Sequence, residues 1–171
     1  TLDRASAASD VYKRQLLPQL RWATEIVYVD CESKDESKEA AKEHGCSVHS
    51  RPNSTNLNVN KSFAMEQATG DWIFYIDPDE RLTELLAREI EEKLEKTTHS
   101  AFRHNRRNHF FVHCLRHGSQ YPDVQLRLFR RGFANFQNRH VHEKLVVDGS
   151  IGKLQYDMLH FPYLNISQFL S

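Results

Sequence analysis

The sequence predicts an α/β fold with a mostly parallel central sheet and helices packed around it. Over the first hundred residues, short apolar segments alternate with helix-like segments, as they do in proteins with parallel sheets. Residues 72–76 are five apolar residues in a row, which indicates a strand buried on both faces. Beyond residue 100 the segment VQLRLFR alternates in polarity, which predicts a smaller antiparallel extension.

The elements expected before residue 100 follow from periodicity and from residues that begin or end helices. Gly45 and Gly70 end two of the helices, as glycines do after a last helical turn. Thr83 caps a third helix, and Ser33 or Asp35 caps the first. We expect a helix remnant at 16–22, strands at 25–30, 46–49 and 72–76, and helices at 36–44, 59–68 and 83–96. The third helix has an apolar spacing that predicts an inner face of Leu85, Leu86, Ile90 and Leu94.

The second half of the chain reads as strands, and both ends depart from a globular pattern. We expect strands at 101–107, at 124–130, near 140–147 and near 153–160, with a helix beginning at 166–170. Residues 1–15 have no clean period and resemble a translated cloning adapter, the alternative being a disordered tail. We therefore expect a single domain over 16–171, truncated at both ends.

Composition limits the class of protein. A chain of 171 residues suits one domain with a substantial core. Lys plus Arg and Asp plus Glu both number 23, so the net charge of zero favours no nucleic-acid partner. The three cysteines lie far apart without a CxxC pair, so neither a zinc ribbon nor a disulfide framework is indicated. A reducing, cytoplasmic setting fits best, and no apolar run approaches the roughly 20 residues that span a bilayer.

The strand at 72–76 runs into three acids, Asp77, Asp79 and Glu80. Pro78 cannot continue a central strand, so these acids lie at the carboxyl end of the strand, where open α/β sheets bind ligands. Carboxylates there are ligands that a hard divalent cation shares with substrate phosphates. The alternative is an ordinary turn followed by the helix that Thr83 caps.

Five sequence blocks, taken in order, resemble one family: EIVYVD, ATGDWIFYIDPDE, YPDVQLRLFRR, RHVHE and LHFPY. They resemble family-2 glycosyltransferases of the GT-A fold, and most of all the bacterial lipopolysaccharide-core β-1,4-glucosyltransferase group. The resemblance covers residues 16–171. It implies inverting transfer of a sugar, in the first place glucose from UDP-glucose, to a lipopolysaccharide-core or other glycolipid or polysaccharide acceptor. It also implies that a first strand and its nucleotide-holding turn are missing here.

The resemblance also implies site residues. Asp30, and with it Asp35, would contact the base or ribose of the donor, and Lys61 would meet its diphosphate. Asp77 and Asp79 would bind Mn²⁺ or Mg²⁺, together with the late His160. Arg127 and Arg130 would clamp phosphate or an anionic acceptor. The alternatives are a loop-capping aspartate, a solvated lysine, a structural histidine and solvated strand arginines.

An inverting transfer also needs a carboxylate that takes the proton of the acceptor hydroxyl. Glu143, which follows His142, is the first candidate and Asp123 the second. The alternative for Asp123 is a turn acid, and for Glu143 an acid on a strand face.

A basic and aromatic run over residues 103–116 suggests peripheral contact with the anionic cytoplasmic face of the inner membrane, where acceptors of this group reside. Two other functions stay open from the sequence. One is a non-catalytic protein that binds sugar nucleotides, and the other is a nucleotidyltransferase.

Overall fold

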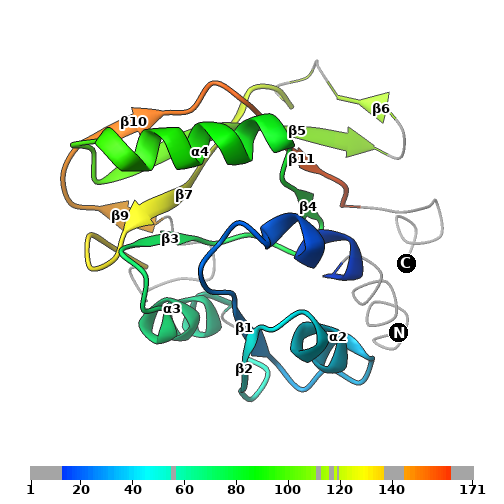
Figure 1. Cartoon of the computed structure of the whole chain (residues 1–171). Coiled ribbons are helices and arrows are strands. Elements are labelled where there is room, and N and C mark those ends of the chain that lie inside the picture. The colour runs from blue at the N-terminus through cyan, green and yellow to red at the C-terminus, as the bar shows by residue number, and fades with distance from the viewer. Residues whose placement is uncertain are drawn as a thin grey trace.

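The computed structural model describes residues 13–54, 57–110, 113–115, 118, 120–136 and 145–162. Figure 1 shows an α/β fold in which α4 lies over a large sheet, while two helices and two short strands, which pair with each other in a sheet of their own, lie below it in the view. The first half of the chain comprises η1 (Leu17–Leu20), β1 (Val27–Asp30), α2 (Ser37–Glu43), β2 (Ser47–Ser50), α3 (Leu57–Gln67), β3 (Trp72–Phe74), β4 (Glu80–Arg81) and α4 (Glu84–Lys96).

Strands make up the rest of the described chain. They are β5 (Ala101–Phe110), β6 (His113–Cys114), β7 (Asp123–Arg130), β8 (Ala134–Phe136), β9 (Leu145–Val147), β10 (Ile151–Lys153) and β11 (Met158–His160). No helix in the described ranges is long and apolar enough to cross a membrane.

The sheets combine parallel and antiparallel pairs. The strands β1 and β2 pair in parallel, as predicted for the first half of the chain. The large sheet has the order β3-β7-β5-β11-β4. Its long strand β5 pairs in parallel with β10 and β11 and antiparallel with β7. The prediction of an antiparallel strand at 124–130 is thus confirmed, and β3 joins this sheet through β7, also antiparallel.

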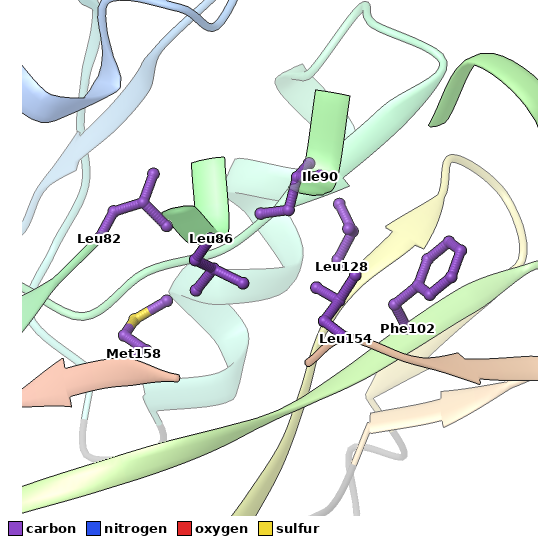
Figure 2. Close-up of a cluster of buried hydrophobic side chains, with 7 residues drawn as sticks. All are labelled: Leu82, Leu86, Ile90, Phe102, Leu128, Leu154 and Met158. Carbon is purple, nitrogen blue, oxygen red and sulfur yellow. The ribbon is translucent and has the colours of Figure 1, made fainter. Parts of the chain in front are cut away.

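The core lies on both sides of the large sheet. On one side α4 packs on the sheet through a cluster shown in Figure 2, consisting of Leu82, Leu86, Ile90, Phe102, Leu128, Leu154 and Met158. On the other side Ala101 and Phe129 pack with Phe136 and Leu145. The side chains of β3 and the two residues after it alternate between these clusters. Both faces of this segment therefore pack against the core, but its residues are only partly buried and not buried as expected.

Several local predictions are confirmed. The hydroxyl of Thr83 accepts a hydrogen bond from the backbone N–H of Leu86 at 3.2 Å, so it caps α4. Gly45 follows the end of α2 with a φ of +75°, a conformation that costs glycine little. Asp35 accepts a hydrogen bond from the backbone N–H of Ser37 at 3.1 Å and thereby supports the start of α2.

Five details differ from expectation. The single strand expected near 153–160 is two short strands, β10 and β11, with a connection between them. The strand β3, expected within the parallel sheet, pairs antiparallel with β7 among the described strands. The strand expected at 72–76 ends at Phe74. The inner face predicted for α4 is wrong at Leu85, whose side chain is 54% exposed, because the buried stripe passes through Leu86 and Ile90 instead. The strand expected at 101–107 continues to Phe110, because β11 pairs with residues 106–108 and β6 with residues 109–110.

The residues just before the expected domain boundary also contact the domain. The ammonium group of Lys13 donates to the hydroxyl of Tyr28 at 2.9 Å. The side-chain oxygen of Gln15 accepts from Arg81 at 2.7 Å. Arg14 also contacts the domain, because its guanidinium group donates to Glu36 at 2.9 Å. Residues 1–12 of the expected tail lie outside the described residues.

Candidate functional site

The Asp77–Pro78–Asp79–Glu80 segment is a turn held against the large sheet. The backbone N–H of Glu80 donates to the carbonyl of Asp77 at 3.0 Å, which closes the turn. The strand β4 begins at Glu80 and pairs antiparallel with β11, which places Glu80 opposite His160. From the sequence, an ordinary turn was the alternative to acids that lie near His160. The structure shows both features at once.

Asp77 is surrounded by cations. Its carboxylate lies 3.1 Å from the ammonium group of Lys61 and 2.8 Å from the guanidinium group of Arg127. Burial opposes ionisation of Asp77, but Arg127 and Lys61 outweigh this effect, and the pKa of Asp77 is lowered. The ring of Tyr75 lies beside both cations, 5.2 Å from Lys61 and 4.8 Å from Arg127.

Glu80 is fully buried and joins two arginines. One carboxylate oxygen lies 2.8 Å from Arg127 and 3.1 Å from Arg106. The other accepts a hydrogen bond from the backbone N–H of Asp77 at 2.9 Å. Burial raises the pKa of Glu80, and the charge of Arg127 opposes that rise. Glu80 thus holds the turn and Arg127 in one arrangement.

Asp123 accepts hydrogen bonds from three side chains. Arg106 donates at 2.9 Å through Nε and lies 2.8 Å away through Nη2. Asn108 donates to the same carboxylate oxygen at 3.0 Å, and Gln125 donates to the other at 2.6 Å. Burial raises the pKa of Asp123, but the bonds from Asn108 and Arg106 dominate and the pKa is lowered.

Asp79 pairs with His160. The imidazole Nε2 lies 3.2 Å from a carboxylate oxygen of Asp79, and Nδ1 lies 2.7 Å from the side-chain oxygen of Asn108. The backbone N–H of Phe161 donates to the carbonyl of Asp79 at 2.8 Å, which fixes the turn beside the end of β11. One third of the Asp79 side chain remains exposed, so the pair is accessible from solvent.

These contacts form a continuous chain of side chains, which we call the polar network. Each member contacts the next in the order Lys61, Asp77, Arg127, Glu80, Arg106, Asp123, Asn108, His160 and Asp79. Six of its members were predicted site residues: Lys61, Asp77, Asp79, Asp123, Arg127 and His160.

Three members of the polar network carried no predicted role. The sequence marks Glu80 only as the third of three acids, and Arg106 only as part of the basic run at 103–116. Asn108 gave no signal, because its function in the network depends on the strands that pair on either side of β5. The only feature of the sequence that points to a role for Glu80 is its position directly after Asp77 and Asp79.

The structure leaves three predicted donor-binding residues away from the polar network. Asp30 is buried at the end of β1, and its Oδ1 has no hydrogen-bond partner among the described residues. Asp35 supports the start of α2. Arg130 donates to the carbonyls of Thr97 and His99 and stacks on Trp72 at 4.7 Å. Glu143, the first candidate base, lies outside the described residues.

The residues implied to bind a metal meet the requirements of a divalent cation only in part. Within the described ranges, no group of three or more His, Cys, Asp or Glu side chains is arranged to hold a metal ion. Asp79 and His160 fit as two ligands, since an oxygen and a nitrogen already face each other at 3.2 Å. Asp77 fits less well, because its two carboxylate oxygens already lie against Lys61 and Arg127.

Comparison with known proteins places the chain in a family. A solved structure of S. aureus TarS, residues 1–349 in complex with UDP-GlcNAc, superposes with a TM-score of 0.66 at 12% identity, covering 95% of this chain and 58% of that one. The lipopolysaccharide core biosynthesis glycosyltransferase LpsC of Rhizobium meliloti (strain 1021) is 33% identical over 104 residues. That match covers 59% of this chain and 38% of LpsC, so the chain spans well under two thirds of either protein. The superposition shows that the fold is GT-A. The model of glycosyl transferase family 2 matches residues 14–148, and the chain therefore belongs to that family.

Proposed function

We propose that this chain is part of an inverting glycosyltransferase that moves a sugar from a nucleotide-diphosphate donor to an acceptor of the bacterial cell envelope. The observation that carries the proposal is the polar network at the acid turn after β3, where Lys61 and Arg127 flank Asp77 and His160 faces Asp79. This network combines a cation for phosphate, Lys61, with a partly exposed acid, Asp79, in a chain of glycosyl transferase family 2.

The proposed donor is a UDP-sugar, with UDP-glucose first among them. The TarS structure contains UDP-GlcNAc, which supports a uridine diphosphate donor. Asp30 supports the same assignment, because a buried carboxylate oxygen without a partner in the described chain is suited to accept a hydrogen bond from a uracil N–H or a ribose hydroxyl. The name of LpsC supports a lipopolysaccharide-core acceptor.

The proposed reaction is a single displacement at the anomeric carbon. The acceptor hydroxyl oxygen forms a bond to that carbon on one face while the bond to the diphosphate breaks on the other. Lys61 contributes positive charge beside the departing diphosphate, and Arg127 keeps Asp77 and Lys61 in place. If Mn²⁺ or Mg²⁺ is bound, Asp79 and His160 would hold it, and it would supply further positive charge for the leaving group.

We propose Glu143 as the base that takes the proton of the acceptor hydroxyl. The surroundings of Asp123 support this choice, because three donors already occupy its two oxygens and lower its pKa. A carboxylate stabilised in this way in its ionised form is a weak base. Asp123 would then serve to hold Arg106 and Asn108.

Calorimetric titration of UDP into the chain, with and without Mn²⁺, tests the donor site. We expect binding that strengthens with Mn²⁺ and that loses this dependence in Asp79→Ala. Asp71→Ala is the matched control. Asp71 is an exposed acid that precedes β3, whereas the turn follows the opposite end of that strand. Absence of UDP binding in both conditions would contradict the donor site. Release of UDP from UDP-glucose, rather than of pyrophosphate, would then separate a glycosyltransferase from a nucleotidyltransferase.

A further inference from the structure

Asn108 joins the two ends of the polar network. It lies on β5, between β7, which carries Asp123, and β11, which carries His160. Its amide contacts the Asp123 carboxylate at 3.0 Å and the imidazole of His160 at 2.7 Å. Neither contact involves a residue adjacent in sequence, so the pairing of β5 with both strands creates them.

The surroundings of Asn108 define which way its amide points. Its NH₂ group lies 3.0 Å from a carboxylate oxygen of Asp123 and 3.2 Å from the backbone carbonyl of Gln120. Both of these partners only accept hydrogen bonds, because the lowered pKa keeps Asp123 ionised. The NH₂ group must therefore face them, and the amide oxygen must face His160.

This orientation defines the tautomer of His160. The amide oxygen can only accept, so the imidazole Nδ1 at 2.7 Å must carry a proton and donate it. The opposite ring nitrogen, Nε2, then faces Asp79 at 3.2 Å. In the neutral ring, Nε2 carries a lone pair and meets a carboxylate oxygen that also only accepts.

Two acceptors facing each other are suited to a shared cation. We infer that Asn108 is a positioning residue, which fixes the Nδ1–H tautomer of His160 and so directs Nε2, together with Asp79, toward a divalent cation. This inference rests on the proposed function only for what the cation does. The backbone supports it as well, since His160 pairs with Asn108 on one side and with Glu80 on the other, which holds the ring in place.

The first test reads the tautomer directly. Long-range proton–nitrogen NMR correlation of the imidazole rings is recorded on the metal-free chain under conditions where the ring is neutral. His160→Asn identifies the signals of His160. We expect a proton on Nδ1 in the parent chain and a shift toward the Nε2–H form in Asn108→Ala. A parent ring protonated on Nε2 alone would overturn the inference.

The second test reads binding of Mn²⁺ alone, followed by electron paramagnetic resonance. Loss of a residue that orients a metal ligand typically weakens metal affinity about 10–100-fold, and we expect a loss of that size in Asn108→Ala. Asn135→Ala is the control, because Asn135 is exposed on β8. An unchanged Mn²⁺ affinity in Asn108→Ala would count against the inference.

A further variant guards against loss of folding. His160→Asn keeps an amide donor near the position of Nδ1, and so keeps the bond to Asn108, but it removes Nε2. If Nε2 of His160 did not bind the cation, this variant would retain both its thermal stability and its Mn²⁺ affinity. We expect it to keep stability and lose Mn²⁺ affinity. Failure of UDP binding with a confirmed tautomer would refute the proposed function alone.

Discussion

Asp77 and Asp79 are two residues apart and have different surroundings. Asp77 contacts Lys61 and Arg127, and these cations lower its pKa. Asp79 contacts His160 instead. Each of the two acid side chains is one third exposed, so their partners distinguish them and their exposure does not. The spacing of the two acids predicts one metal-binding pair, but the environment separates an acid that organises cations from an acid that is available to a ligand.

His104 provides a prediction at the scale of one residue. Its side chain is fully buried, and Nδ1 bonds the carbonyl of Asn105 at 3.1 Å. Burial lowers the pKa of His104 to about 4, from an ordinary value of 6.5. Between these two values the unfolded chain binds a proton that the folded chain does not, so the free energy of unfolding falls as pH decreases from 6.5 to 4.

The loss that we expect from this one group is about 3 kcal/mol, at about 1.4 kcal/mol per pKa unit. Urea denaturation of the parent chain and of His104→Gln, measured across that pH range, checks it. The variant has no titrating group at this position, so its stability should fall less steeply with decreasing pH. Parallel curves for the two proteins would show that His104 is not the cause.

At the scale of elements, α4 is the helix that covers the large sheet. Thr83 begins it, and its buried stripe packs on the core cluster of Figure 2. A second contact joins it to the connection between β10 and β11, because the carboxylate of Glu89 accepts hydrogen bonds from the backbone N–H groups of Gln155 and Tyr156. The helix thus holds the segment that leads to His160.

Leu85 and Leu86 provide a matched pair on α4. Leu86 is fully buried, whereas Leu85 is 54% exposed. We expect Leu86→Ala to lower the free energy of unfolding by about 2–5 kcal/mol, because it leaves a cavity. Leu85→Ala should change it by about 0.5 kcal/mol or less. Both variants make the same change in helix propensity, so equal losses in urea denaturation would mean that the packing of α4 is different from that described.

At the scale of the whole molecule, Arg127 joins separate parts of the chain. It extends from β7 to Asp77 in the turn after β3 and to Glu80 at the start of β4. Its side chain is 5% exposed and that of Glu80 is fully buried, so this pair is shielded from water, whereas Asp77 is one third exposed. Burial disfavours its charge, but Glu80 and Asp77 outweigh burial, and the pKa of Arg127 is raised.

We expect Arg127→Met to lower the free energy of unfolding by about 3–5 kcal/mol, because it leaves buried carboxylate charge without its partner. Glu80→Gln added to this variant should restore part of the loss, since it removes one of the uncompensated charges. Arg131→Met is the control, because Arg131 is exposed and its side chain donates to the carbonyl of Gly70. Urea denaturation measures all of these variants. A loss below about 1 kcal/mol for Arg127→Met would contradict a structural role.

The sequence by itself predicted the elements and the family. Local periodicity was sufficient for the helices and for most strands, because each helix or strand repeats its own apolar spacing. The order of the acid, arginine and histidine blocks was sufficient for the resemblance, which the family match confirmed. The predictions were less accurate for the end of β3 at Phe74 and for the buried face of α4 at Leu85. Tertiary contacts determine where strand pairing stops and which side chains are covered.

Only the tertiary structure decided how the site residues meet. The register of β5 against β7 shifts by one residue between Phe102 and Arg103, and beyond that shift Arg106 lies opposite Asp123. Without it, Arg106 would lie opposite Val124, and Asp123 would lie opposite Arg107 instead. The same strand places Asn108 beside His160, 52 residues later in the chain. Strand register depends on contacts between distant segments, so no local pattern in the sequence reveals it.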